Sequence, residues 1–199
     1  MKEVTTAVTL LTNERPKAGR LVLAALLLAL MWTAISSRGD AQSAATVRVL
    51  GPAAAIPVGQ SFVVTIAIEN AQDLGAFEFE YSFSPTVATT IVNNIHLGSM
   101  LGSSGRTTGE LRLASAPGQP GTPLFGAYSY GAGAGPNGNG VLATVTMTAA
   151  GPGVSPLTLA GLKVTNARGD EYPVTSIAGS VTVTNAPRLI YLPLLRRSH

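Results

Sequence analysis

Apolar and polar residues alternate along most of the chain between residues 46 and 184. The alternation is clearest in segments 140–147, 157–164 and 179–184, which are separated by Gly, Pro and Asn residues. A two-residue period interrupted by turn residues is typical of antiparallel strands joined by tight turns. We predict eight to nine short strands and no amphipathic helix. This pattern favours an all-β fold, a two-sheet antiparallel β-sandwich.

The strand through residues 77–83 has the most distinctive pattern. Its aromatic residues occupy one face, and Glu78, Glu80 and Ser82 occupy the other. Each aromatic side chain buries a large apolar area, so we expect the stripe to lie in the core. A row of aromatic rings can also stack on sugars, but the charged opposite face favours the core. The aromatic residues are Phe77, Phe79, Tyr81 and Phe83.

Several segments together resemble the cohesin domain family. They are the early strand at 58–68, the strand at 74–85 that ends in Phe-Ser-Pro, and the run from Gly140 to Thr184. The resemblance covers roughly residues 46–184. It implies a jelly-roll sandwich, related in fold to cellulose-binding modules, that binds a dockerin module without catalysis. It also implies a link to extracellular polysaccharide degradation.

The resemblance also suggests where a partner binds. The best-known cohesins carry an Asn-x-Asp pattern on one strand, and the matching positions here are Ala76 and Glu78. Glu78 keeps the charge, whereas Ala76 lacks the amide, so dockerin specificity is not carried over with the fold. We expect the partner surface to include Glu78, Glu80, Ser82 and Thr146.

Composition and charge narrow the function classes. The formal net charge is +3, but the basic excess lies at the two ends, and residues 45–187 hold five basic and seven acidic residues. Binding to nucleic acid needs basic residues clustered on one face, so no nucleic-acid partner is expected. The absence of cysteine excludes disulfides, thiolate metal sites and a cysteine nucleophile.

The two ends differ from the strand-rich middle. Lys17 and Arg20 precede an apolar run at 21–35, followed by small residues. This order predicts a signal peptide over 1–43 with cleavage near 41–43, and hence a secreted or cell-envelope protein whose only membrane contact is the export signal. The sandwich is predicted over 46–185. The tail 186–199 is apolar and basic. It fits a sorting label, an interfacial anchor, a strand added to another protein's sheet, or a frayed end.

The sequence contains no arrangement of residues typical of a catalytic site, so we expect neither enzymatic activity nor a cofactor. The two histidines are His96, in a predicted loop, and the terminal His199, and no nucleophile turn surrounds any serine. The Gly-rich segment 131–140 is followed by a strand rather than a helix, so it is interpreted as a turn and not as a phosphate loop.

One turn offers oxygen atoms that could bind calcium. Asn166, Asp170 and Glu171 are the candidates, but a calcium site needs six or more oxygens. The turn-forming chemistry of Asn, Gly and Asp favours a solvated turn instead. The tripeptide Arg168-Gly-Asp170 also matches an adhesion sequence, which arises easily by chance on a glycine turn.

Two other functions stay open. A carbohydrate-binding module of the same fold would need exposed aromatic rings, for which Tyr128, Tyr130 and Tyr172 are the candidates. At least two of these tyrosines would have to line up on one exposed face. The second alternative is a purely structural spacer of the cell envelope.

Overall fold

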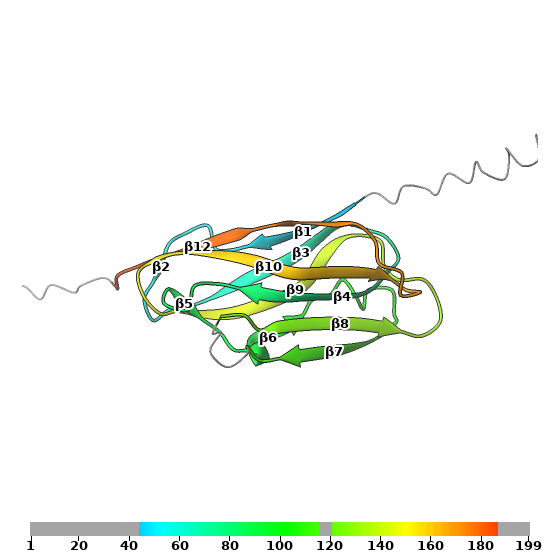
Figure 1. The fold of residues 1–199 in the computed structure, drawn as a ribbon, viewed down its shortest axis with the longest axis horizontal. Coiled ribbons are helices and arrows are strands. Elements are labelled where there is room, and N and C mark those ends of the chain that lie inside the picture. The colour runs from blue at the N-terminus through cyan, green and yellow to red at the C-terminus, as the bar shows by residue number, and fades with distance from the viewer. Residues whose placement is uncertain (1–43, 116–120, 187–199) are drawn as a thin grey trace, which may run out of the picture. The chain divides into compact units, whose positions relative to one another are not determined.

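The computed structural model describes residues 44–115 and 121–186. Its twelve strands form two six-stranded sheets, which confirms the all-β, jelly-roll sandwich (Figure 1). The described residues contain a single turn of 3-10 helix, η1 (Val92–Asn94), and no helix long and apolar enough to cross a membrane. The predicted signal peptide and apolar tail lie outside the described residues and stay predictions.

Sheet 1 contains six strands in the order β11-β1-β3-β9-β5, with β6 also paired to β9. All its pairs are antiparallel except β1 with β11, which is parallel. The strand bounds are β1 (Ala45–Leu50), β3 (Ser61–Ala71), β5 (Ala88–Thr89), β6 (Ile95–Leu97), β9 (Gly138–Ala149) and β11 (Val174–Ile177).

Sheet 2 contains the other six strands in the order β2-β12-β10-β4-β8-β7. Figure 1 shows β10, β4, β8 and β7 side by side. The strand bounds are β2 (Ile56–Pro57), β4 (Leu74–Ser82), β7 (Thr107–Leu113), β8 (Leu124–Tyr130), β10 (Gly153–Asn166) and β12 (Gly179–Thr184). The pair β2–β12 is parallel.

The strand count exceeds the predicted eight to nine because several strands are very short. β2 and β5 have two residues each, and β6 has three. A segment of two or three residues cannot show an alternating pattern, so periodicity does not reveal it. Such strands form because their neighbours in space offer free backbone groups.

The aromatic stripe at 77–83, which begins in β4 and ends just after it, lies in the core, as predicted. All four of its side chains are buried, and the rings of Phe77 and Phe79 lie 6.2 and 5.9 Å from the ring of Phe125 on β8. The Tyr81 hydroxyl donates a hydrogen bond to Met147 Sδ on β9 at 3.2 Å. This bond joins the two sheets, and burial raises the pKa of Tyr81 far above its ordinary value.

Candidate binding face

The outer surface of sheet 2 is the strongest candidate for a functional site. The strand register places Ala76 of β4 between Thr165 of β10 and Tyr128 of β8. The next outward residue, Glu78, lies between Lys163 and Gly126. We call the outward-facing residues of β10, β4, β8 and β7 the sheet 2 face.

Large apolar side chains are concentrated on the β8 and β7 part of the sheet 2 face. Leu111 lies opposite Gly126, and Leu113 lies opposite Leu124, so the leucines of β7 point the same way as the outward residues of β8. Four side chains here are about half exposed: Leu111 (50%), Leu113 (54%), Tyr128 (51%) and Tyr130 (56%). Apolar side chains gathered on one surface mark an interaction site, whereas single ones do not.

The two tyrosines lie next to each other on this face. Their ring centroids are 6.3 Å apart and their planes are tilted by 32°. Tyr128 lies over Gly109 of β7, because a Cβ added to that glycine would come within 2.5 Å of Tyr128 Cζ. The ring therefore covers the backbone of the neighbouring strand and remains about half exposed.

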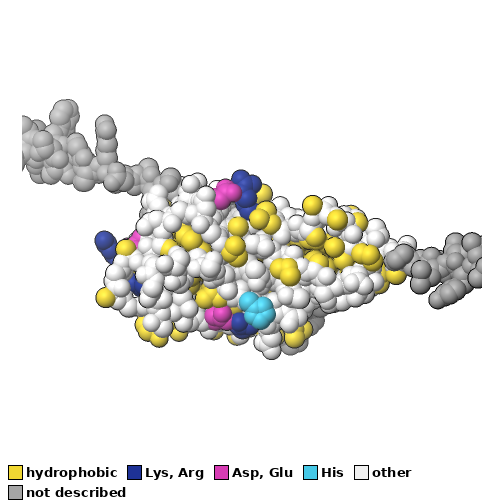
Figure 2. Space-filling model, turned by 180° about the vertical axis from the view of Figure 1, so that it is seen from behind, with side chains coloured by type: hydrophobic (Ala, Val, Ile, Leu, Met, Phe, Trp, Pro, Cys, Tyr) yellow, Lys and Arg dark blue, Asp and Glu magenta, His cyan; other side chains and the backbone are white. Residues whose placement is uncertain are grey.

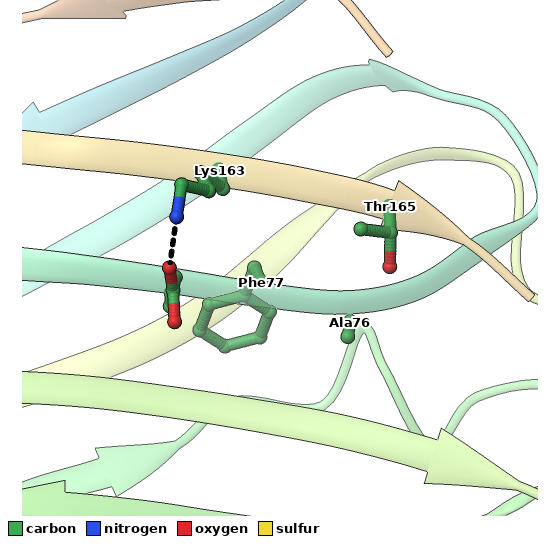
Figure 3. Close-up of a pocket in the computed structure, with 5 residues that line it drawn as sticks. Ala76, Phe77, Lys163 and Thr165 are labelled. Atoms are coloured by element: carbon green, nitrogen blue, oxygen red, sulfur yellow. Dashed lines mark hydrogen bonds and ion pairs between the residues drawn. The ribbon is translucent and has the colours of Figure 1, made fainter. Parts of the chain in front are cut away.

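Two shallow hollows flank β4 at Ala76. One, of about 250 Å³, lies toward β10 and is lined by Ala76, Phe77, Glu78, Lys163 and Thr165 (Figure 3). The other, of about 140 Å³, lies toward β8 and β7. Both share the segment 76–78 of β4 as their floor. They exist because Ala76 has a short side chain and Gly126 has none, so no side chain fills the space beside Tyr128.

The charged groups of the sheet 2 face differ in their partners. Lys163 Nζ donates a hydrogen bond to Glu78 Oε1 at 2.9 Å, which Figure 3 shows as a dashed line. This hydrogen bond and the charge of Glu78 raise the pKa of Lys163. The carboxylate of Glu80 makes no ion pair among the described residues. The free acid on this face is therefore Glu80.

The structure brings together three of the four predicted partner-binding residues. Glu78, Glu80 and Ser82 all lie outward on β4. Thr146 lies on β9 of sheet 1, opposite Val63, and its carbonyl accepts a hydrogen bond from Thr90 Oγ1 at 2.7 Å. The expectation that Thr146 shares a surface with Glu78 is wrong, since alternation within a strand does not say which sheet the strand joins.

The three tyrosines predicted as carbohydrate-binding residues do not share one surface either. Tyr128 and Tyr130 lie together on an exposed face, whereas Tyr172 is buried, at 3% exposure. The Tyr172 amide donates to the Val164 carbonyl at 3.2 Å, and burial raises the pKa of its phenol. Tyr172 therefore cannot stack on a sugar, which corrects that part of the prediction.

The calcium candidates lie on the turn after β10. Asn166 Oδ1 accepts hydrogen bonds from the amides of Arg168 and Asp170, at 2.9 and 3.0 Å. Asn166 Nδ2 donates to Asp170 Oδ2 at 3.1 Å, and Glu171 is exposed. These oxygens hold the turn, and within 44–115 and 121–186 no three acidic, His or Cys side chains are grouped to hold a metal.

The outward leucines of β7 are site residues that the alternation in the sequence does not reveal. In the segment Glu110-Leu-Arg-Leu113, alternation alone would turn the leucines inward, but the structure turns Glu110 and Arg112 inward instead. The Arg112 guanidinium lies 5.5 Å from the centre of the Phe125 ring and its Nε donates to Glu110 Oε2 at 2.9 Å. These charged side chains can point inward because β7 is an edge strand, and the edge of a sandwich stays open to water.

The opposite side of the molecule, formed by sheet 1, also exposes apolar side chains. Figure 2 shows mainly uncharged side chains on that side. Leu50, Val63 and Ile177 are exposed on the neighbouring strands β1, β3 and β11 of sheet 1. His96 is exposed, as expected, although it lies on β6 rather than in a loop. The group on β8 and β7 differs from the exposed apolar side chains of sheet 1 in containing two neighbouring tyrosine rings.

The sequence model of the cohesin domain matches residues 46–183. The chain resembles a non-cellulosomal cohesin from the archaeon Archaeoglobus fulgidus (19% identity, 72% of this chain, 93% of that one, TM-score 0.56). It also resembles a type II cohesin module of an Acetivibrio cellulolyticus scaffoldin (16%, 77%, 97%, TM-score 0.59). A chain of a type I cohesin–dockerin complex from Clostridium thermocellum is similar too (12%, 74%, 97%, TM-score 0.58). No curated protein matches in sequence.

Proposed function

The chain belongs to the cohesin domain family, and we propose that it is a secreted, non-catalytic module that binds a dockerin-type partner through the sheet 2 face. The observation that carries this proposal is the grouping of four half-exposed apolar side chains on β8 and β7. Burying such groups against a partner removes apolar area from water, which drives association. Several solved structures similar to this chain are cohesin–dockerin complexes.

The charges beside the apolar groups support the same proposal. Glu78 is neutralised by Lys163, so covering this pair removes no net charge from water. Glu80 can accept a hydrogen bond from a partner or form an ion pair with it, and so select between partners. We further propose that the assembly serves extracellular polysaccharide degradation, as the family resemblance implies.

The test is binding of purified dockerin modules from the same organism, measured by calorimetry. We expect Leu111→Ser and Tyr128→Ala each to weaken binding at least tenfold, because large side chains near the centre of an interface carry most of its energy. The double change Glu78→Ala/Glu80→Ala should weaken binding as well. Val63→Ser is the matched control, because Val63 is 53% exposed on sheet 1 and Leu111 is 50% exposed. Equal losses for Val63→Ser and Leu111→Ser, or no dockerin that binds, would overturn the proposal.

The tyrosine pair favours a second candidate function, carbohydrate binding. Tyr128 and Tyr130 meet the requirement of two aligned, exposed aromatic rings. A panel of soluble polysaccharides tests it by affinity electrophoresis. Sugar stacking predicts that Tyr128→Ala and Tyr130→Ala abolish retardation while Leu113→Ser does not. No retardation of the unchanged protein by any polysaccharide would leave protein binding as the function.

A further inference from the structure

The two hollows beside β4 give the sheet 2 face a specific point of attachment. The hollow toward β10 is bordered by Lys163 and Thr165, and the hollow toward β8 and β7 is bordered by Leu111 and Tyr128. The floor is the segment 76–78. We call this feature the Ala76 trough.

The trough is built for an apolar group. Ala76 and Gly126 place no polar atom of their own side chains in it, and the one charged pair at its border is already bonded internally. A cavity of about 150 Å³ lined by apolar side chains accepts a benzene-sized molecule, so hollows of 140 and 250 Å³ have room for one bulky side chain. Tyr128 and Leu111 would cover that side chain from one side.

A charge lies at a fixed distance from the trough. Glu80 follows Ala76 by four residues on the same strand face, which at 3.3–3.4 Å per residue places it about 13 Å along β4. Because Glu80 has no ion-pair partner among the described residues, a cation would complement it. Two positions seven residues apart on a helix lie on one face and are about 10.5 Å apart. A long Lys or Arg side chain at the second position can span the remaining distance to Glu80.

We propose that the partner of this chain inserts one bulky aliphatic side chain into the Ala76 trough and places a Lys or Arg beside Glu80. The inference rests on the proposed function and specifies its partner. Recognition at position 76 then depends on fit to an apolar hollow, and not on a hydrogen bond to a side-chain amide. Filling the trough would exclude the partner even though the rest of the face is unchanged.

The test uses a display library of dockerin modules in which the surface helix positions are randomised, selected on the unchanged full-length protein. We expect the selected modules to carry Leu, Ile or Met at one position and Lys or Arg about seven positions away. Their dissociation constants should rise at least tenfold with Ala76→Leu, which fills the trough, and less with Ala76→Ser, which changes polarity with little volume. Glu80→Gln should weaken only the modules that carry the basic residue.

The matched control is Ala67→Leu, the same substitution at an outward position of β3 in sheet 1. Circular dichroism melting of each variant verifies that it folds. Modules that bind Ala76→Leu as tightly as the unchanged protein, yet lose binding with Leu111→Ser, would overturn the trough while keeping the sheet 2 face. Modules that are insensitive to Leu111→Ser as well would overturn the proposed function itself.

Discussion

At the scale of single residues, several glycines permit backbone contacts that no other residue allows. Gly75, at the start of β4, is the tightest of these, because a Cβ there would lie 2.0 Å from the carbonyl oxygen of Asn166. This approach brings the turn after β10 against the strand that carries Ala76 and Glu78. A methyl group at position 75 would push these two backbones apart.

We therefore expect Gly75→Ala to lower the free energy of unfolding by about 1–3 kcal/mol, the usual cost of overpacking. Gly102→Ala serves as the control, because its Cβ would meet only the Thr108 methyl at 3.6 Å, an ordinary contact. That variant should stay within about 0.5 kcal/mol of the unchanged protein. Urea unfolding followed by circular dichroism measures both. Equal stability of the two variants would contradict the close approach.

At the scale of elements, β7 shows how an exposed sheet edge is protected. Its backbone pairs with β8 on one side and with no described strand on the other. Glu110 and Arg112 point inward at this edge, and Arg112 also donates to the Asn93 carbonyl at 3.3 Å. Inward-pointing charges on an edge strand discourage pairing with the edge of another molecule.

Replacing this ion pair by apolar residues should open the edge to self-association. We expect Glu110→Val/Arg112→Val to form dimers or larger species at concentrations where the unchanged protein does not, as measured by gel filtration with light scattering. Arg48→Val/Glu69→Val is the control, because it removes an ion pair between β1 and β3, which are each paired on both sides. If both double variants associate to the same extent, loss of charge in general, and not the edge, is the cause.

At the scale of the whole molecule, the buried tyrosines link the stability of the sandwich to alkaline pH. Tyr81 lies between the sheets and burial raises its pKa; burial raises the pKa of Tyr172 as well. Below about pH 10 the folded and the unfolded chain both keep these phenol protons, so these two groups do not make the stability depend on pH. Above pH 10 the unfolded chain loses protons that the folded chain retains. Rising pH therefore favours unfolding.

We expect the free energy of unfolding to fall above pH 10 by as much as about 1.4 kcal/mol per pH unit for each such tyrosine. The Tyr81→Phe variant should show a shallower fall, whatever its stability at pH 7. Urea midpoints measured between pH 8 and pH 11 give both slopes. Identical slopes would show that Tyr81 ionises in the folded protein as readily as in the unfolded one.

The sequence determined the local features and the fold class of this protein. The alternation in β3, β4 and β9 and the aromatic stripe at 77–83 follow from side-chain direction along a strand, so they required no knowledge of neighbours. The same rule placed Glu78, Glu80 and Ser82 on one face. Each of these features depends on residues close together in the chain.

Only the tertiary structure decided which strands lie side by side. In the structure Thr146 lies on sheet 1, Tyr172 is buried, and Leu111 and Leu113 point outward at the edge of sheet 2. The structure also brought Ala76 beside Gly126 and Tyr128, which lie 50 and 52 residues further along the chain. Sheet order and register depend on pairing between distant segments, and a two-residue period contains no information about which segments pair.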